Sequence, residues 1–309
     1  MITQPTVLVL GAGASIPYGF PSGRDLYFQI KRNLDTQTRE PNNQYLWGKL
    51  LSLGYSAGDI ASFKSALDFA DPLSVDAFLE HRNEFLPIGK LAIALTLIPL
   101  ENPERLFNIG RGKDVQESWY RYLMGRLDAN DCLDFRRNKL SIITFNYDRS
   151  LEHYLFTSLM NNFGINSEKC AHALSATPII HVHGSLGSLP WQGKRWSRAY
   201  VGTDNLEVVQ KASQEIVVMS EKEEEASVFD AAFDLLNEAE KIYFLGFGYH
   251  PTNLRRLKIR NLARKLNRHG TSVGMRQAEL NSIDQAWGIG FHGADIGILD
   301  LFRSYVLPE

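Results

Sequence analysis

The fold is decided near the amino terminus, where residues 6–24 read TVLVLGAGASIPYGFPSGR. Val7 to Leu10 form a short apolar run that contains β-branched residues, which is typical of a buried strand. The run breaks into the glycine-containing loop GAGAS, and a helical pattern begins after the glycine and proline of GFPSG. A strand, a glycine loop and a helix in this order form the opening unit of a doubly wound α/β sheet.

The remaining pattern divides into a helical middle and an alternating second half. Residues 35–139 show helical periodicity with few convincing strands, over 56–69, 75–85, 90–98 and 115–127. Strand-like runs return at 140–145, 178–182, 215–219 and 241–247, with helical patterns at 226–240 and 253–268. This alternation predicts a mostly parallel, Rossmann-like sheet over residues 1–34 and 140–309, covered on both faces, with a helical subdomain inserted over 35–139. We expect residues 186–203 to form a loop or short hairpin over one edge of the sheet.

Composition excludes several classes of protein. Of 309 residues, 44% are hydrophobic, which is enough for a sizeable core, and the net charge of −2 provides no field for non-specific nucleic-acid binding. The apolar run at 91–100 is half the roughly 20 residues that cross a bilayer, so we expect a core helix. The first residues lack the pattern of a signal peptide. We therefore expect a soluble, cytoplasmic protein without a membrane segment.

The stretch 253–269 carries seven Lys and Arg residues and no acid. At helical spacing its leucines, at 254, 257, 262 and 266, would face the core while the basic side chains face solvent or an anionic partner. A solvated helix face is favoured over a nucleic-acid site for such an isolated stripe.

The glycine loop taken alone is a weak signal. Glycines let a backbone approach a phosphate, and the following helix N-terminus favours its charge, but a tight strand–helix turn needs glycines as well. The third glycine of the dehydrogenase pattern GxGxxG is replaced by Ile16, and Asp35 lies in a polar stretch with no strand before it. An ordinary hydride-transfer enzyme is therefore disfavoured.

A longer comparison is more specific. Residues 11–24, GAGASIPYGFPSGR, resemble the sirtuin fingerprint GAGxSxxxGIPxFR, with Phe20 in place of isoleucine and Gly23 in place of phenylalanine. Residues 144–148, TFNYD, resemble the sirtuin element T-Q-N-x-D, and His183-Gly184 resembles the sirtuin histidine–glycine pair. Residues 246–248, GFG, stand where sirtuins have a G-[TS]-S turn, and SVDAFL at 74–79 is similar to an S-[IV]-D-x-F-L element of bacterial antiphage sirtuin-like proteins.

This resemblance implies an NAD hydrolase of the antiphage-defence type, which lacks the zinc module of the protein deacylases. The chain agrees with that type, because its two cysteines, Cys132 and Cys170, are too few for a four-thiolate zinc site. The resemblance also implies assembly of the protein with itself or with a sensor or ATPase partner. It implies catalytic roles for Asn146 and His183 and an NAD-binding set of Gly11, Ala12, Gly13, Ser15, Phe20, Pro21, Arg24, Thr144, Asp148, Ser185, Gly246, Phe247 and Gly248.

The chemistry of these residues suits cleavage of the bond between nicotinamide and ribose. Nicotinamide leaves as a neutral base, so the protein needs to hold the ribose and orient one water molecule. The Asn146 amide can both donate and accept hydrogen bonds, and the His183 imidazole can accept a proton at neutral pH. The glycine loop with Ser15 would bind the diphosphate, residues 246–248 the adenosine half, and Asp148 the nicotinamide end.

Other interpretations stay open at this point. The protein is alternatively an NAD-dependent protein deacylase, which the missing cysteines and Gly23 disfavour, or a catalytically silent module that binds NAD or ADP-ribose. Asn146 alternatively caps the helix that follows it. His181 and His183 alternatively form a metal-binding pair that a carboxylate such as Asp148 would complete.

Overall fold

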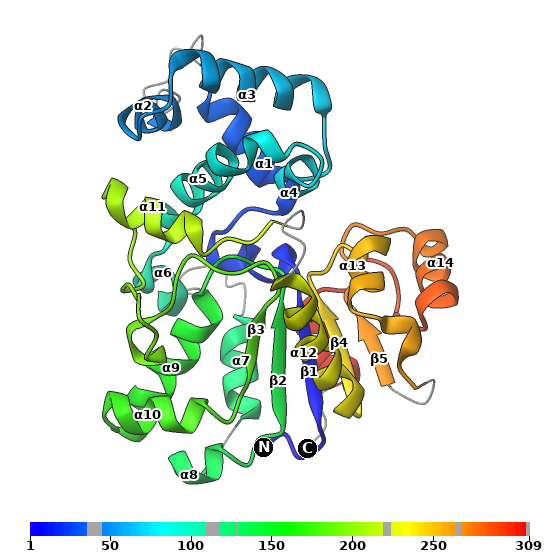
Figure 1. The fold of residues 1–309 in the computed structure, drawn as a ribbon. Coiled ribbons are helices and arrows are strands. Elements are labelled where there is room, and N and C mark those ends of the chain that lie inside the picture. The colour runs from blue at the N-terminus through cyan, green and yellow to red at the C-terminus, as the bar shows by residue number, and fades with distance from the viewer. Residues whose placement is uncertain (36–44, 109–117, 128, 219–223, 264–266, 307–309) are drawn as a thin grey trace.

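The structure is a computed structural model, described here over residues 1–35, 45–108, 118–127, 129–218, 224–263 and 267–306. Five parallel strands form one sheet in the order β3-β2-β1-β4-β5 (Figure 1). They are β1 (Thr6–Leu10), β2 (Leu140–Thr144), β3 (Ile179–His181), β4 (Lys241–Leu245) and β5 (Asn267–Gly270). The expected α/β, Rossmann-like fold with a parallel sheet is confirmed.

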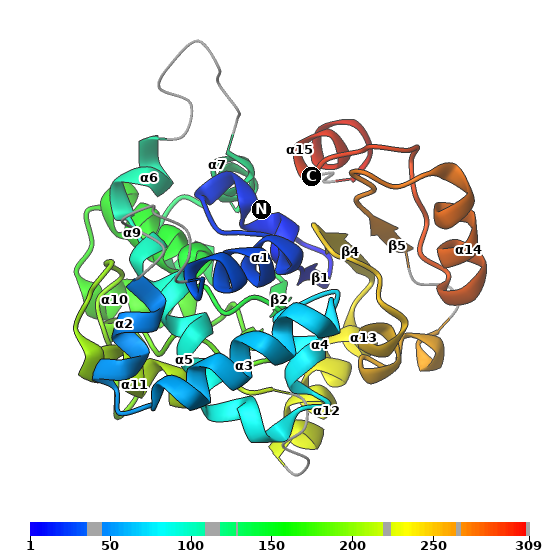
Figure 2. The same cartoon turned by 90° about the horizontal axis from the view of Figure 1, so that it is seen from above.

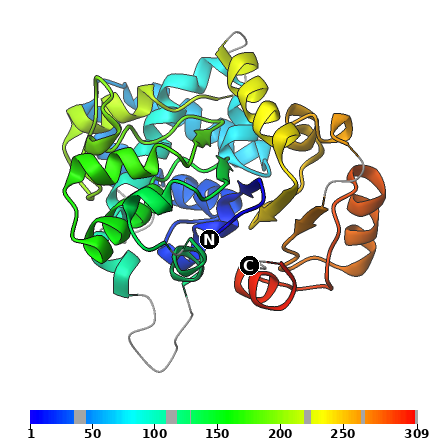
Figure 3. The same ribbon diagram turned by 90° about the horizontal axis from the view of Figure 1, so that it is seen from below.

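Helices cover both faces of the sheet, because alternate strand residues point in opposite directions. Leu8 and Leu10 belong to a hydrophobic cluster with α7 (Trp119–Arg126), α9 (Ser150–Phe163), α10 (Ser167–Leu174) and α15 (Ile298–Leu301). Val7 and Val9 belong to a second cluster with α12 (Glu224–Glu238), α13 (Pro251–Arg256) and α14 (Gln277–Trp287). Figure 3 shows the yellow α12 on one side of the strands and the red α15 on the other. The sheet is therefore doubly wound.

The described part of residues 35–139 contains helices and no strand. After α1 (Gly23–Asn33) come α2 (Tyr45–Ser52), α3 (Ala57–Ala70), α4 (Val75–Leu79), α5 (Leu86–Leu97), α6 (Pro103–Asn108), α7 and α8 (Cys132–Phe135). Helices α1 to α5, together with α11 (Leu206–Gln214), lie beyond the carboxyl ends of the strands (Figure 1). Their apolar side chains join the cluster of Leu8 and Leu10, so this layer and one face of the sheet share a hydrophobic core. Its description as a separate subdomain stays a prediction.

The apolar run at 91–100 is a core element, as its sequence predicts. Residues 83–100 are long and apolar enough to span a membrane, but 61% of this segment is buried inside the protein. Within it, α5 packs against α1, α2 and α11. This burial is compatible with a soluble protein.

Two predicted elements are wrong. The strand expected at 215–219 is reduced to an isolated antiparallel bridge between Ile216 and Gly184, because α11 extends to Gln214 and leaves too little chain to pair further; position 219 lies outside the described residues. The helix expected at 253–268 ends at Arg256, since Lys258 has the left-handed backbone angle φ of +52°. Leu254, Leu257 and Leu262 are buried as expected, while position 266 lies outside the described residues.

Smaller differences concern the ends of elements. The helix expected at 75–85 is divided into α4 and a 3-10 turn at Asn83–Phe85, and the described part of the helix expected at 115–127 is α7. The stretch 186–203 is a loop with one 3-10 turn, Pro190–Gln192. Seen from above, β5, α13 and α14 lie on one side of β4, and α9, α10 and α11 lie on the other (Figure 2).

Candidate active site

The register of the sheet brings the sequence motifs to one edge. Leu10 pairs with Thr144 of β2 and with Leu245 of β4, and Thr144 pairs with His181 of β3. The glycine loop and the motifs at 144–148, 181–184 and 246–248 therefore all follow the carboxyl ends of neighbouring strands. The chain order reverses at β1, with β2 on one side and β4 on the other. Ligands of open α/β sheets bind at this kind of reversal point.

The turns that follow β1 and β4 interlock. The amide of Gly11 donates to the carbonyl of Leu245, and that of Gly13 to the carbonyl of Gly246, both at 3.0 Å. A Cβ atom on Gly13 would lie 2.8 Å from the Gly246 Cα, and one on Gly246 would lie 2.1 Å from the backbone nitrogen of Ala14. Gly246 also has a φ of +56°, which favours glycine. Close packing of two backbones thus accounts for these glycines, and their contact with a diphosphate stays a prediction.

Replacement of Gly246 by alanine is expected to destabilise the fold. The new methyl group would meet the backbone of residues 13 and 14, and the left-handed conformation itself costs an alanine about 1–2 kcal/mol. We expect the free energy of unfolding to fall by at least about 2 kcal/mol in a urea titration. Gly248→Ala is the matched control, because no atom lies within 4 Å of its Cβ position. Equal stability of the two variants would contradict the interlocked turns.

Asn146 lies between the first two strand ends. Its side-chain amide donates to the Gly11 carbonyl and to the Ser15 hydroxyl, both at 3.0 Å, and its backbone amide donates to the Thr144 hydroxyl. The side-chain oxygen Oδ1 is buried and accepts a hydrogen bond from no described residue. A buried acceptor without a donor is costly. The Asn146 oxygen is therefore placed to accept a hydrogen bond from a ligand or from a water molecule.

Asp148 supports this arrangement from the start of α9. Its carboxylate accepts hydrogen bonds from the backbone amide and the hydroxyl of Ser150, so Asp148 rather than Asn146 serves the start of the helix. Burial raises the pKa of Asp148, against hydrogen bonds from Ser150 and Ser15 that lower it. The Tyr120 hydroxyl lies 2.7 Å from the Ser150 hydroxyl. Helix α7 is thereby connected to the site.

These side chains surround a very small cavity of about 10 Å³. That is about the space of one water molecule. Several predicted site residues converge here, because the lining contains Ser15, Thr144, Asn146 and Asp148. Glu152 also lines it.

Glu152 is a site residue that no motif in the sequence predicts, and its partner is His181, which the sequence suggests only as half of a metal-binding pair. His181 Nε2 lies 2.5 Å from Glu152 Oε1, and His181 Nδ1 lies 2.8 Å from the Asn146 carbonyl oxygen. Burial lowers the pKa of His181, but the Glu152 carboxylate outweighs it and raises this pKa above its usual value. Glu152 follows Asp148 by one helical turn, which is the signal that places the two acids on one face. His181 orients the backbone of Asn146.

His183 packs against the aromatic side chains of the 145–147 segment. Its ring is 5.3 Å from that of Phe145 and 6.3 Å from that of Tyr147, and it does not line the small cavity. Burial, and next the positive charge of Arg256, lower the pKa of His183 to about 4, while Glu80 opposes this shift. The imidazole is therefore neutral at pH 7. Its meeting with the Asn146 side chain over a ribose stays a prediction.

The geometry does not favour the metal-binding alternative. Both ring nitrogens of His181 are engaged, by Glu152 and by the Asn146 carbonyl, while the ring of His183 packs against aromatic rings. Within the described ranges, no three His, Cys, Asp or Glu side chains are grouped to hold a metal ion.

The motif at 74–79 brings the helical layer onto the site. Ser74 caps α4 by accepting a hydrogen bond from the amide of Ala77, and the Tyr147 hydroxyl donates to the carboxylate of Asp76. On the same side of the molecule, Arg256 of α13 pairs with Glu80 at 3.3 Å. Two polar contacts therefore hold α4 and the residue after it against the sheet edge that carries Asn146 and His183.

The loop at 186–203 is anchored by a buried ion pair. The Arg149 guanidinium is 1% exposed, lies 2.7 Å from Glu101 and donates to the carbonyls of Gly187, Ser188, Arg198 and Ala199. Arg198 approaches the same carboxylate at 2.8 Å. Glu101 is the centre of a closed network that fixes the loop beside the site.

The other predicted binding residues differ in their surroundings. Phe20 is buried in the core, and Phe247 is buried with its ring 5.0 Å from that of Phe145. Arg24 is exposed, with its guanidinium 5.5 Å over the ring of Phe28 rather than in the hydrogen-bond network of Asn146. The partly buried residues of the set are Ala12, Gly13, Pro21, Ser185 and Gly246, and Gly248 is exposed.

Comparisons with known proteins do not assign a function to this chain. No protein-family model matches the chain. No curated protein matches it in sequence either. The function must therefore be inferred from the motifs and from their arrangement at the carboxyl edge of the sheet.

Proposed function

We propose that this protein is an NAD glycohydrolase that converts NAD and water to nicotinamide and ADP-ribose. The observation that carries the proposal is the Asn146 amide, held by Gly11 and Ser15 at the reversal point of the sheet with its buried oxygen unpaired. The resemblance of three motifs to sirtuins, in the same order, supports NAD as the substrate.

The reaction follows from the chemistry of the side chains. The bond between the ribose C1′ and nicotinamide breaks, and the electron pair leaves with nicotinamide, so the leaving group needs little acid assistance. A water oxygen bonds to C1′ and releases a proton. Asn146 Oδ1 accepts a hydrogen bond from that water or from a ribose hydroxyl, and neutral His183 accepts the released proton.

The site must widen before NAD enters. A cavity of about 10 Å³ is far smaller than the several hundred Å³ that typical ligand pockets enclose. The contact between Tyr147 and Asp76 and the ion pair between Arg256 and Glu80 join α4 to the sheet edge, and their separation would widen the entrance. We infer that an enzyme with this closed site would be in a resting form.

A catalytically silent receptor for NAD or ADP-ribose is the second candidate, because the same strand-end turns could bind a dinucleotide without cleaving it. The presence of both Asn146 and His183, the two residues to which the sirtuin resemblance gives catalytic roles, favours catalysis over a silent receptor. We further propose that the enzyme acts in the cytoplasm in antiphage defence. In that role it would assemble with itself or with a sensor or ATPase partner.

One experiment separates these functions. The purified protein is incubated with NAD, and the products are resolved by chromatography, with and without an acyl-lysine peptide. Nicotinamide and ADP-ribose without peptide are expected. Products that require the peptide would indicate a deacylase, and NAD binding without turnover would indicate the silent receptor. The absence of both NAD binding and NAD turnover would overturn the proposal.

The pH dependence of the reaction tests the role of His183. Because its pKa is lowered to about 4, the neutral base persists as the pH falls, so kcat/KM is expected to stay nearly constant from about pH 8 to about pH 5. It should then decline as the pH passes through about 4. The rate of NAD consumption measures this profile. A decline centred near the ordinary histidine value of about 6.5 would argue against the buried imidazole as the base.

A further inference from the structure

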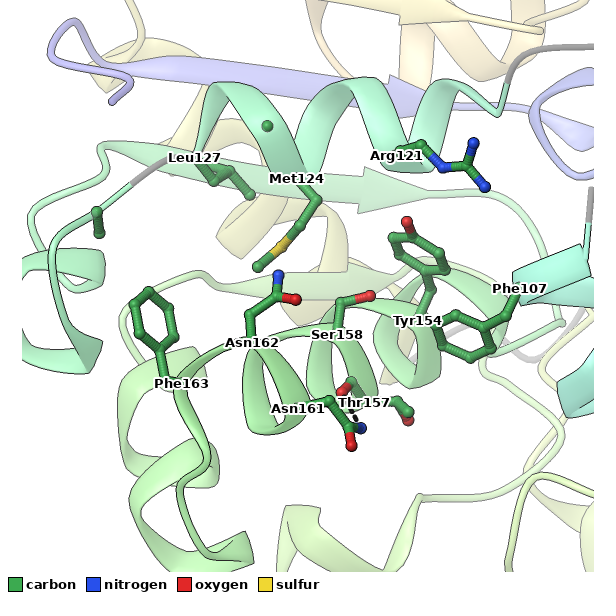
Figure 4. A pocket seen from close by; sticks show the side chains of 12 residues that line it. Phe107, Arg121, Met124, Leu127, Tyr154, Thr157, Ser158, Asn161, Asn162 and Phe163 are labelled. Atoms are coloured by element: carbon green, nitrogen blue, oxygen red, sulfur yellow. Dashed lines mark hydrogen bonds between the residues drawn. The ribbon is translucent and has the colours of Figure 1, made fainter.

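A second cavity lies between α7 and α9, behind the candidate active site. It encloses about 720 Å³, which is within the range of small-molecule pockets. In Figure 4, side chains of α7 and α9 face each other across it. Arg121, Tyr154 and Phe107 lie at one end, and Leu127 and Phe163 lie at the other.

The first end is suited to an anion. Burial raises the pKa of Tyr154, while hydrogen bonds from Ser158 and the nearby Arg121 lower it, so the guanidinium lies against a neutral hydroxyl. Among the residues that the structure describes, no carboxylate pairs with Arg121. An arginine fork binds carboxylate or phosphate with paired hydrogen bonds. Tyr154, which accepts the hydrogen bond from Ser158, supplies a hydroxyl donor to the same group.

The rest of the cavity is suited to an apolar body. The rings of Phe107 and Tyr154 stack with their centroids 5.0 Å apart, and Met124 points into the space between the helices (Figure 4). Methionine side chains adapt to irregular apolar ligands. Leu127, the residue just after α7, is six residues beyond Arg121, so the two ends are separated by roughly 9 Å along the helix axis.

We propose that this cavity binds a small amphipathic organic anion, with its carboxylate or phosphate at Arg121 and its aromatic or aliphatic body along Met124 and Leu127. This inference does not depend on the activity proposed for the sheet edge. It concerns a different cavity and different residues.

The same helices connect this cavity to the candidate active site. The ring of Tyr154 is 5.4 Å from that of Tyr120, whose hydroxyl meets Ser150, and Ser150 in turn donates to Asp148. The indole of Trp119, one residue earlier on α7, donates to the Ala14 carbonyl at 2.9 Å. A ligand that moves α7 against α9 therefore acts on the glycine loop and on Asp148, which makes the cavity an effector site.

Calorimetric titration of the full chain tests the binding. The probes are adenosine monophosphate and indole-3-propionate, their uncharged counterparts adenosine and indole-3-propionamide, and inorganic phosphate. We expect at least one of the two organic anions to bind. Which of them binds will show whether the cavity takes a phosphate or a carboxylate. We expect its uncharged counterpart and inorganic phosphate to bind at least about tenfold more weakly.

Two variants assign that binding to the cavity. Arg121→Gln is expected to weaken it about tenfold or more, whereas Arg126→Gln, on the same helix outside the lining, leaves it unchanged. Met124→Trp should obstruct the space and block binding. Failure of both anions to bind, or binding unaffected by Arg121→Gln, would overturn the proposal.

Hydrogen exchange tests the connection. The ligand is expected to slow amide exchange over residues 144–152. Tyr120→Phe should keep the affinity and abolish this protection, because it removes the hydroxyl that meets Ser150. Protection that survives in Tyr120→Phe would show that the signal does not pass through that contact.

Discussion

Replacement of Asn146 by alanine is expected to lower kcat for NAD cleavage by about 10³-fold. The change removes both the amide that holds Gly11 and Ser15 and the unpaired oxygen that faces the cavity. Without that acceptor, neither the attacking water nor a ribose hydroxyl is oriented in the transition state. The KM for NAD should change much less, because in the proposed mode of binding most of the dinucleotide would contact other residues. Steady-state assays of nicotinamide release measure both constants.

Asn138 provides the matched control for this variant. It is also a buried asparagine, but it lies at the amino ends of the strands. Its side-chain oxygen accepts a hydrogen bond from Ile2, and its side-chain nitrogen donates to the carbonyls of Leu127 and Phe135. Asn138→Ala should lose stability in a urea titration and keep its kcat once folded. Asn146→Ala also loses two buried hydrogen bonds and some stability, but unlike Asn138→Ala it should lose kcat even when it is fully folded. An Asn146→Ala enzyme as fast as the wild type would remove the observation on which the proposed function rests.

Replacement of Arg149 by methionine is expected to reduce the free energy of unfolding by about 3 kcal/mol or more. Glu101 is fully buried and would keep Arg198 as its remaining positive partner, and the carbonyls of the 186–203 loop would lose their shared donor. A loss of this size is a large part of the stability of a typical domain, about 5–15 kcal/mol. Urea unfolding followed by circular dichroism measures the change.

An exposed arginine gives the comparison for Arg149. Arg137 pairs with Asp134 at 3.3 Å with 71% of its side chain exposed, and solvent screens such pairs strongly. Arg137→Met should therefore leave the free energy of unfolding almost unchanged. Arg149→Met with equally small cost would show that the buried network does not hold the loop.

The fold was predictable where local signals and topology agree. The apolar run before Gly11 and the alternating strands after residue 140 indicate a parallel sheet, and such strands need no distant information to be recognised. The strand predicted at 215–219 does not form, and the sequence could not show this, because an apolar run of that length is equally compatible with a short bridge. The helix predicted at 253–268 ends early although this stretch contains no glycine or proline. No local signal in the sequence therefore marks the left-handed turn at Lys258.

The candidate site was predictable in part for the same reason. Motifs that follow parallel strands must meet at one edge, which placed Asn146 near Gly11 and Gly246. The partnership of His181 with Glu152 depends on how α9 packs against β3, and the contact of Tyr147 with Asp76 joins residues 71 positions apart. Contacts of this kind leave no periodic pattern in the chain.

The interlocked turns also limit how the protein can move. The loops after β1 and β4 leave no space for even one methyl group between them, so they behave mechanically as a single rigid block. Any opening motion must then occur at the opposite wall, where side-chain contacts, rather than close-packed main chain, hold α4 in place. The turns after β1 and β4 therefore form the rigid side of the site, and α4 forms the side that would move.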